Sequence, residues 1–459
     1  GFNKTTGGGN NFLGNRAGFS NTTGSLNNFI GNRAGYCNTT GGCNNFIGLY
    51  VGKCNTTGNQ NNFIGFWAGC NNTTGNSNNF IGREAGKCNT TGNYNNFLGY
   101  LAGQNNTTGN QNNFIGFCAG FSNTTGFYNK FIGLYAGRCN TTGSYNNFLG
   151  CSAGQNNTTG NQNNFFGSFA GYVNTTGSCN NMIGLGAGRC ATVTGQHNTF
   201  LGNYAGKCAS GSGAYNNFFG RYAGCKNTTG LMNNFIGLCA GLSNISGCNN
   251  NFIGLNAGIS NTTGSQNNFI GKSAGELNTT GYANNFFGAL TGYCNTTGGC
   301  NNFIGLYAGQ CSTTGIDNNF IGALVGRDNS TGSKNNFIGK CVGYKNTTGS
   351  CNVFLGTYAG FANTTGSNNT FIGACAGLGN TTGCCNTMIG LGAGRYAEVT
   401  GSHNTFLGTY AGKCASGSGG YNNFFGRQAG FYNTTGSNNN FIGNETGKCN
   451  TTGSGNNFI

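Results

Sequence analysis

The chain has 459 residues, of which 91 are Gly and none is Pro, and 6% are charged. Collagen is excluded because Gly falls well short of every third residue and Pro is absent, while the 38 Phe and 20 Tyr exceed what disordered polar segments carry. No run approaches the roughly 18 apolar residues that a membrane-spanning helix needs, so the sequence predicts no membrane span.

One repeat of 17 residues runs through the whole chain. Its aromatic anchor recurs in 27 units from Phe12 to Phe458, with Met in its place at Met182 and Met388. The unit reads Asn-Thr-Thr-Gly-x-x-Asn-Asn-Phe-Ile-Gly-x-x-Ala-Gly-x-x, as in 21–37, and we number its positions as columns one to 17. After each Met, two successive intervals between anchors have 18 residues instead of 17. This pattern recurs twelve units later, between 182 and 388, so the sequence contains a twelve-unit superrepeat. The extra residue falls just before column one, within 191–195 and 209–213 in the first copy.

This unit is too short for a helical hairpin or a propeller blade, which need about 30 residues or more. Gly in columns 4, 11 and 15 separates short β-compatible stretches, and we expect the chain to turn there with positive φ. The sequence therefore predicts an all-β parallel solenoid, a β-roll or β-helix, of 27 coils that includes four 18-residue coils, with successive coils about 4.8 Å apart. We expect 1–459 to be a single continuous array, either an excerpt of a longer chain or an end-to-end polymer, because both ends fall within the pattern without capping segments.

Asn in columns 1, 7 and 8 is expected to form hydrogen-bonded ladders along the stack. Column 1 also begins an Asn-x-Ser/Thr sequon in most units, so glycosylation is the competing interpretation, for example at Asn21, Asn38 and Asn55. Sugars on every coil would collide at a spacing of about 4.8 Å. The Thr-Thr of columns 2 and 3 makes an ice-binding face a minor alternative, because adjacent residues of a strand point to opposite faces and each coil offers one outward Thr.

Columns 9 and 10 are neighbours in an extended strand, so their side chains point to opposite sides. Column 9 is predicted to form the core. Its first members are Phe12, Phe29, Phe46, Phe63, Phe80, Phe97, Phe114, Phe131, Phe148, Phe165, Met182, Phe200, Phe218 and Phe235. Column 10 holds Ile, Leu or Phe from Leu13 to Ile459, and such an apolar stripe is expected to pack against another solenoid in a homo-oligomer, as a trimer or a filament. The alternative is that a bulge at column 11 turns both residues into a flattened core.

Aromatic residues in column 13 are candidates for stacking on sugars, or else they pack between protomers. They are Tyr50, Trp67, Tyr135, Phe169 and Tyr307. Many of the 21 bases lie in column 16, and the net charge is +15. This basic edge is either solvated or contacts anionic polysaccharide or cell-surface glycans, and nucleic-acid binding is not predicted because no recognised fold or Arg cluster supports it.

Cysteines in column 17 stack in three places. The candidate axial disulfides are Cys37 with Cys54, Cys190 with Cys208, and Cys294 with Cys311, because a coil spacing of about 4.8 Å lies in the Cα range of disulfides. The alternative is that each Cys is a small buried residue. No Cys-x-x-Cys occurs and there are two His, so no metal is predicted. The six acids form no close pair, so we expect neither an enzyme nor a cofactor.

The motif Asn-Asn-Phe-Ile-Gly-x-x-Ala-Gly, as at 27–35, together with Asn-Thr-Thr-Gly, resembles the short repeats of bacterial surface proteins and phage-type tail-fibre proteins. More distantly, Phe-Ile-Gly-x-x-Ala is similar to the unit in the β-roll heads of trimeric autotransporter adhesins. This resemblance and the composition predict an extracellular structural fibre at a cell or virion surface. The alternative function is a receptor- or glycan-binding adhesin or tail fibre.

Overall fold

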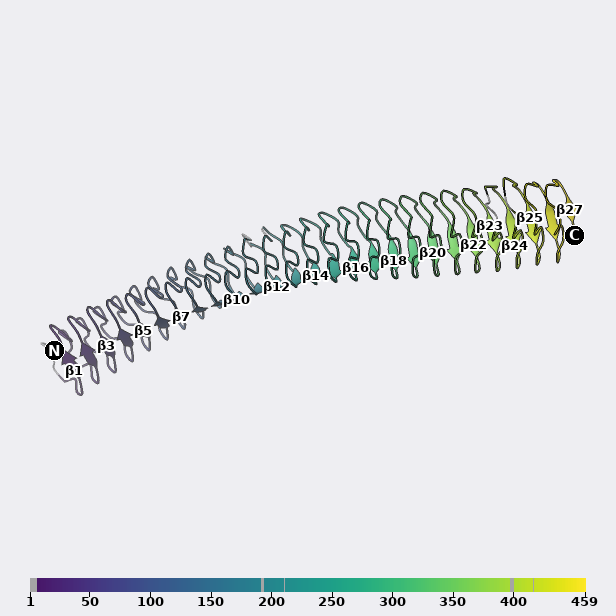
Figure 1. The fold of residues 1–459 in the computed structure, drawn as a ribbon. Helices are drawn as coiled ribbons and strands as arrows, with labels where there is room; N and C mark the ends of the chain where they lie inside the picture. Colours follow the sequence, from purple (N-terminus) through teal and green to yellow (C-terminus); the bar gives the residue numbers. More distant parts are fainter. Residues whose placement is uncertain (1–5, 191–193, 210, 397–399, 416) are drawn as a thin grey trace. The chain divides into compact units, whose positions relative to one another are not determined.

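The computed structural model describes residues 6–190, 194–209, 211–396, 400–415 and 417–459. In these ranges the chain is a parallel β-solenoid with one short strand per coil and no helix (Figure 1). This confirms the predicted fold class. The chain divides into two compact units, Gly1–Met232 and Asn233–Ile459, and each is described by itself.

Each strand covers columns 8 to 10, the Asn-Phe-Ile of the repeat. The strands of the first unit are β1 (Asn11–Leu13), β2 (Asn28–Ile30), β3 (Asn45–Ile47), β4 (Asn62–Ile64), β5 (Asn79–Ile81), β6 (Asn96–Leu98), β7 (Asn113–Ile115), β8 (Lys130–Ile132), β9 (Asn147–Leu149), β10 (Asn164–Phe166), β11 (Asn181–Ile183), β12 (Thr199–Leu201) and β13 (Asn217–Phe219). Those of the second unit are β14 (Asn234–Ile236), β15 (Asn251–Ile253), β16 (Asn268–Ile270), β17 (Asn285–Phe287), β18 (Asn302–Ile304), β19 (Asn319–Ile321), β20 (Asn336–Ile338), β21 (Val353–Leu355), β22 (Thr370–Ile372), β23 (Thr387–Ile389), β24 (Thr405–Leu407), β25 (Asn423–Phe425), β26 (Asn440–Ile442) and β27 (Asn457–Phe458).

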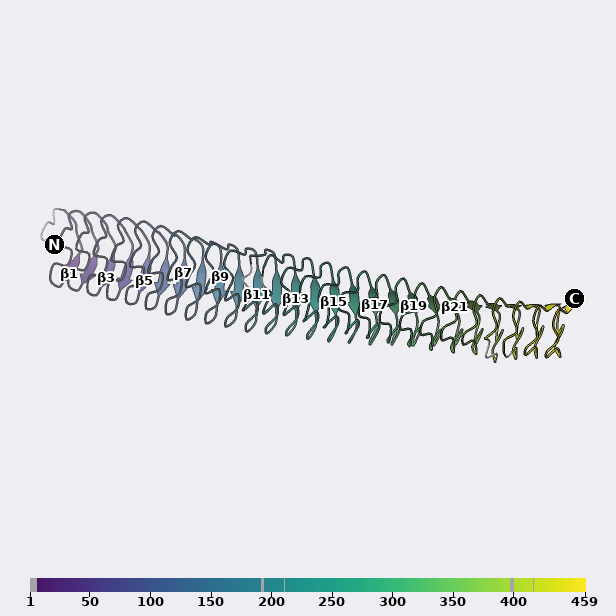
Figure 2. The same ribbon diagram turned by 90° about the horizontal axis from the view of Figure 1, so that it is seen from above.

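Neighbouring strands pair in parallel with the same columns opposite each other. Phe29 lies opposite Phe46 in the pair β2 and β3, and Figure 2 shows such successive strands side by side in the first unit. The 18-residue coils keep this register, since Met182 lies opposite Phe200. The predicted position of the extra residue includes 191–193 and 210, which lie outside the described residues.

The column 9 side chains form the core of each unit. Their rings stack along the coils, with 4.8 Å between the centroids of Phe29 and Phe46 and 4.7 Å between those of Phe63 and Phe80. Most of these rings are fully buried, as is the small Ala of column 14. Offset ring stacking adds about 0.5–1.5 kcal/mol to the gain from burial. Column 10 lies on the outer face, half-buried or exposed, so the alternative of a flattened core that holds both residues is wrong.

Glycine is required in three columns, but for different reasons. Gly31 in column 11 and Gly35 in column 15 have φ of 133° and 57°, as predicted. Gly143 in column 4 does not have positive φ, so the prediction of a left-handed turn there is wrong. It is Gly because the coils approach closely: a Cβ atom would lie 2.5 Å from both the Asn140 Oδ1 and the Gly160 carbonyl oxygen.

Two columns adopt the left-handed conformation without being Gly. Leu26 in column 6 has φ of 58° and Arg33 in column 13 has φ of 55°. Such residues cost on the order of 1–3 kcal/mol each when the surroundings enforce them. Backbone hydrogen bonds to the preceding coil hold both residues in this conformation. The Leu26 N–H donates to the Gly8 carbonyl at 2.9 Å, and the Arg33 N–H donates to the Asn15 carbonyl at 2.9 Å.

Three Asn ladders connect successive coils, as the sequence predicted. In column 1, Asn38 Nδ2 donates to Asn21 Oδ1 at 2.7 Å and to the Gly41 carbonyl of its own coil at 2.9 Å. In column 7, Asn44 Nδ2 donates to the Gly58 carbonyl at 2.8 Å. Column 8 forms a half-buried ladder on the outer face. Because the amides of columns 1 and 7 are buried, these hydrogen bonds are needed to offset their desolvation.

Ser312 interrupts the column 1 ladder, and we expect Ser312→Asn to stabilise the protein. Both the Asn295 Oδ1 and the Ser312 hydroxyl are buried and have no hydrogen-bond partner in the described part of the chain. An Asn side chain would restore the contact and raise the free energy of unfolding by about 1–2 kcal/mol. Urea unfolding followed by circular dichroism measures this gain, with Ser312→Ala as the control that leaves Asn295 unpaired. A midpoint for Ser312→Asn no higher than that of the control would contradict the prediction.

Candidate functional site

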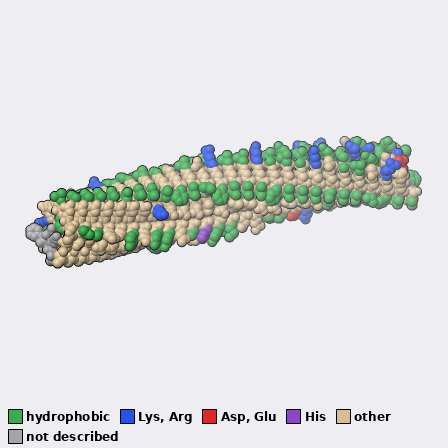
Figure 3. Space-filling model, turned by 90° about the horizontal axis from the view of Figure 1, so that it is seen from below, with side chains coloured by type: hydrophobic (Ala, Val, Ile, Leu, Met, Phe, Trp, Pro, Cys, Tyr) green, Lys and Arg blue, Asp and Glu red, His purple; other side chains and the backbone are tan. Residues whose placement is uncertain are grey.

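The column 10 side chains form an apolar stripe on the outer face of each unit, and we keep this name for them. Exposed members in the first unit include Leu149, Ile183 and Leu201, and those in the second include Ile236, Ile304 and Ile372. Column 12 widens the apolar surface in some coils. Its exposed Leu residues are Leu49, Leu134, Leu185, Leu238, Leu255, Leu306 and Leu391. Figure 3 shows such a line of hydrophobic side chains on one face.

The five column 13 aromatic residues predicted to stack on sugars are half-buried rather than exposed. They are Tyr50, Trp67, Tyr135, Phe169 and Tyr307. Cationic side chains lie over several of these rings. The Lys87 Nζ is 4.2 Å from the centroid of Trp67, and the Arg189 guanidinium carbon is 4.6 Å from that of Phe169. Cation–π contacts therefore occupy part of the ring surface that the prediction left free for a ligand.

One cluster of the first unit brings the basic edge and the column 13 aromatic residues together. A hollow of about 330 Å³ is lined by Arg33, Tyr50, Lys53, Trp67, Cys70 and Lys87. The Tyr50 ring centroid lies 5.5 Å from the Arg33 guanidinium carbon and 5.8 Å from Lys53 Nζ. The chemistry of these groups suits an anion, and binding of anionic polysaccharide here stays a prediction.

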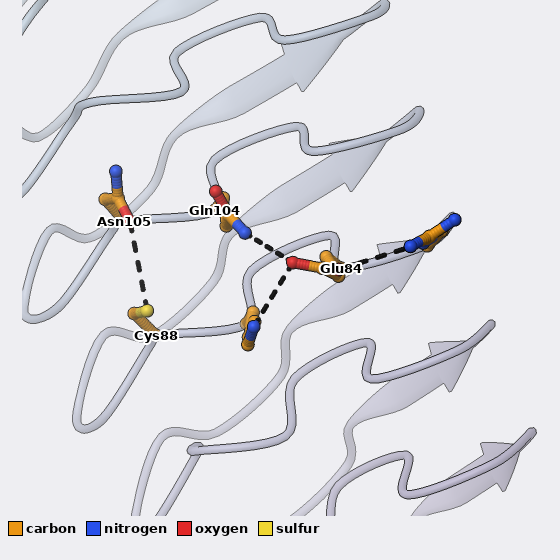
Figure 4. Close-up of polar contacts among 6 residues, drawn as sticks. Glu84, Cys88, Gln104 and Asn105 are labelled. Atoms are coloured by element: carbon orange, nitrogen blue, oxygen red, sulfur yellow. Dashed lines mark hydrogen bonds and ion pairs between the residues drawn. The ribbon is translucent and has the colours of Figure 1, made fainter.

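Glu84 is held by two bases and an amide. Its carboxylate accepts a hydrogen bond from Gln104 Nε2 at 2.5 Å and another from Lys87 Nζ at 3.2 Å (Figure 4). Arg83 Nε lies 3.7 Å from its second oxygen. In the same coils the Cys88 thiol donates to Asn105 Oδ1 at 3.9 Å. With its oxygens engaged in this way, Glu84 is an ion-pairing group that orients Lys87 beside Trp67.

The predicted disulfide partners are free thiols. All six lie within the described ranges, and none of them is bonded to another Cys. Burial raises the pKa of the Cys294 thiol, and the neighbouring Cys311, which also hydrogen-bonds to it, raises that pKa further. Burial and the adjacent Cys54 raise the pKa of Cys37. The three proposed pairings, including Cys190 with Cys208, stay predictions.

Cys70 is a neighbour of Cys54 that the same-column argument missed. It lies in column 16 of the following coil, and its carbonyl accepts from the Cys54 N–H at 2.8 Å. A hydrogen bond from the Cys70 thiol lowers the pKa of Cys54 to about 6, against the opposing effect of burial, while the pKa of Cys70 is raised. The backbone N–H of column 17 regularly donates to the column 16 carbonyl of the next coil, as that of Cys37 does to Lys53. A Cys in column 17 followed by a Cys in column 16 of the next coil was therefore the signal in the sequence.

The three sequon residues proposed for glycosylation are buried. Asn21, Asn38 and Asn55 have no exposed surface. In Asn38 and Asn55 the Nδ2 atom, to which a glycan would be attached, donates both to the preceding Asn and to a Gly carbonyl of its own coil. The folded coil therefore has no room for a sugar at these positions, which corrects the glycosylation prediction.

The described residues contain no cluster of three or more His, Cys, Asp or Glu side chains that could hold a metal ion. Within the same ranges, no helix has the length and hydropathy to cross a membrane.

No family model, curated protein or solved structure matches this chain. The resemblance to surface and tail-fibre repeats, and the surface localisation that it implies, therefore stay predictions.

Proposed function

We propose that this chain is a structural protein that packs laterally against copies of itself to build a fibre or surface appendage. The observation that supports this proposal is the apolar stripe, to which nearly every coil adds one half-buried or exposed Ile, Leu or Phe. An apolar surface that extends along the coils is unusual for a soluble monomer and is typical of an interaction surface.

The spacing of the apolar stripe favours a second copy as the partner. The core rings measure the coil repeat at 4.7–4.8 Å, and a partner buries the stripe along its length only if its own side chains recur at the same interval. Another solenoid of this sequence meets that condition. Each Å² of apolar surface removed from water contributes about 25 cal/mol, and the contribution grows with the number of coils engaged.

The column 8 ladder beside the apolar stripe is compatible with such an interface. The Asn28 amide donates to Asn45 at 2.8 Å, and Asn45 donates to Asn62 at the same distance. Because these amides already hydrogen-bond to one another along the outer face, covering them with a second solenoid leaves fewer polar groups without partners.

We expect the protein at micromolar concentration to have a mass of at least twice that of the 47.2 kDa chain. Four Lys residues in the apolar stripe and column 12 should reduce this to the single-chain mass, because buried unpaired ammonium groups strongly oppose association. The changes are Ile183→Lys, Leu185→Lys, Ile304→Lys and Leu306→Lys. Light scattering after size exclusion measures the mass.

A matched control carries four Lys at other exposed apolar positions, outside columns 10 and 12. Its changes are Leu26→Lys, Leu277→Lys, Tyr282→Lys and Tyr432→Lys, all at exposed side chains. The control should keep the mass of the wild type while having the same added charge. A wild type that stays a single chain at 100 µM, or a control that dissociates as fully as the test variant, would refute lateral packing through the apolar stripe.

A further inference from the structure

A polar groove of about 940 Å³ runs along coils of the first unit, on columns 3 and 5. Its lining is made of six Thr and four Asn, and we call it the Thr/Asn groove. The residues are Thr40, Thr57, Thr74, Thr91, Thr108 and Thr125 with Asn59, Asn76, Asn93 and Asn110. It is separate from columns 10 and 12, so it is independent of the surface proposed for lateral packing.

The two Thr residues of each coil have different roles. The column 2 hydroxyl is used inside the fold, as in Thr39, whose Oγ1 donates to the Thr56 carbonyl at 3.1 Å. The column 3 residues are exposed. No hydrogen bond of a column 3 Thr hydroxyl in the Thr/Asn groove is found among the described residues. One donor and acceptor per coil therefore faces the groove, ready for a ligand.

The Asn side chains of the groove are held in fixed positions. Asn76 Nδ2 donates to the Thr74 carbonyl at 2.9 Å and to Asn93 Oδ1 at 3.2 Å, and its N–H donates to the same oxygen at 2.7 Å. Asn59 makes the equivalent contacts with Asn76. In the other coils column 5 is mostly Ser or Gly, so the four consecutive Asn distinguish these coils. Fixed polar groups reduce the entropy lost when a ligand binds.

An aromatic slot adjoins the Thr/Asn groove. This second hollow, of about 320 Å³, is lined by Asn93, Tyr94, Asn110, Gln111, Phe127 and Tyr128, so the two hollows share Asn93 and Asn110. Tyr94 is 63% exposed and Tyr128 48%. Several of the column 13 rings lie under cations, whereas the rings of this slot have large surfaces open to solvent.

Neighbouring rings support one side of the aromatic slot. Tyr145 stacks on Tyr128 with 5.1 Å between centroids and 8° between planes, and Phe127 meets Tyr128 edge-on at 5.8 Å. Tyr94 and Tyr128 also have the left-handed backbone conformation, with φ of 57° and 55°. Their backbones are thus fixed by the coil stack, which makes the slot a preformed site.

We infer that the Thr/Asn groove and the aromatic slot bind an extended, neutral polysaccharide chain. Hydroxyl and amide groups can hydrogen-bond to sugar hydroxyls, and tyrosine rings can pack on the apolar faces of sugar rings. No charged side chain lines either hollow, which favours a neutral chain over an acidic one. The coil repeat of about 4.8 Å is close to the rise of one sugar unit in an extended β-linked chain, so successive sugars meet successive coils.

Ordered water on an ice-like lattice would also match regular Thr hydroxyls. That use leaves the exposed tyrosines of the slot without a role. The neutral polysaccharide accounts for both hollows together.

The test is calorimetric titration of the full chain with three neutral hexasaccharides, namely cellohexaose, chitohexaose and xylohexaose. At least one is expected to bind, and the variant with Tyr94→Ala and Tyr128→Ala should bind it about tenfold or more weakly, from the loss of two ring contacts. Ala is compatible with this column, because Ala283 occupies it with φ of 52°. The control is Tyr421→Ala, an exposed column 6 tyrosine of the second unit with φ of 60°, which should bind as the wild type does.

A second variant tests the groove itself. Thr74→Val with Thr91→Val removes two outward hydroxyls while keeping the side-chain shape, and it should also weaken binding of the same hexasaccharide. Failure of all three neutral sugars to bind at 10 mM would overturn the inference. Binding that is unchanged in the double Tyr variant would overturn it too. So would hexagalacturonate binding that depends on Tyr94 and Tyr128 in the absence of neutral binding, or thermal hysteresis without any sugar binding.

Discussion

Phe97→Ala is expected to lower the free energy of unfolding by about 3–5 kcal/mol, the usual cost of removing a buried aromatic ring. The ring of Phe97 is fully buried. Its centroid lies 4.8 Å from those of both Phe80 and Phe114, nearly parallel to each. Replacement by Ala loses both stacking contacts and leaves a cavity that the two neighbouring coils cannot close, because their backbones are fixed by ladders on either side. Urea unfolding followed by circular dichroism measures the loss.

Two further variants identify the cause of that loss. Tyr94→Ala in the same coil removes a ring that is 63% exposed, and its effect should stay within about 0.5 kcal/mol. Phe97→Met should cost far less than Phe97→Ala, because Met fills most of the volume and already occupies this column, fully buried, at Met182 and Met388. Equal losses for Phe97→Ala and Tyr94→Ala would show that the ring column is not the main source of stability.

Gly143→Ala is the second large effect, with an expected loss of about 2–3 kcal/mol. The new methyl group would lie 2.5 Å from Asn140 Oδ1 and from the Gly160 carbonyl oxygen. Both oxygens accept hydrogen bonds from Asn157 Nδ2, at 2.8 and 3.1 Å. Neither can move away without breaking the column 1 ladder, so the overlap is relieved only by separating two coils.

The control for this change is Gly8→Ala. A Cβ at Gly8 would have no atom within 4 Å, and its φ is not in the left-handed range. Both changes add the same methyl group and restrict the unfolded chain equally, so only the close approach distinguishes them. Thermal and urea unfolding of the two variants should therefore differ by most of the expected loss. Similar stability of the two would mean that the coils can separate locally at little cost.

The period of the sequence was enough to predict the fold. Because Phe29 and Ile30 are neighbours in a strand, alternation favoured one inside and one outside, and the burial of the two side chains decided against the flattened core that was the alternative. The Asn ladders followed from identical residues that recur at the coil spacing. These predictions succeeded because they depend on the column a residue occupies and hardly on its particular neighbours.

The features that the sequence did not predict depend on contacts between columns. The left-handed backbone at Leu26 and Arg33 has no residue preference to reveal it, since these columns contain Tyr, Cys, Gln and Arg as well. The prediction for column 4 assumed a turn where a close approach is the reason for Gly. The Thr/Asn groove was missed because the argument about Thr considered columns 2 and 3 alone. The consecutive Asn at 59, 76, 93 and 110 were the available signal.

The 18-residue coils have a practical consequence for altering this protein. Around the longer intervals the column 7 ladder continues, with Asn198 Nδ2 donating to Asn180 Oδ1 at 3.1 Å, and Phe200 still lies opposite Phe218. Among the described residues, the Asn174 Oδ1 has no hydrogen-bond partner. Ala209 follows column 17 directly, is buried, and donates its N–H to the Gly206 carbonyl at 3.0 Å, as a column 1 Asn does in other coils. The added residue of that coil therefore comes after column 1, which corrects its predicted position, and it leaves the strands and the aromatic core undisturbed. The segment between columns 1 and 4 is the natural place to splice in a foreign peptide, such as an epitope or a labelling tag.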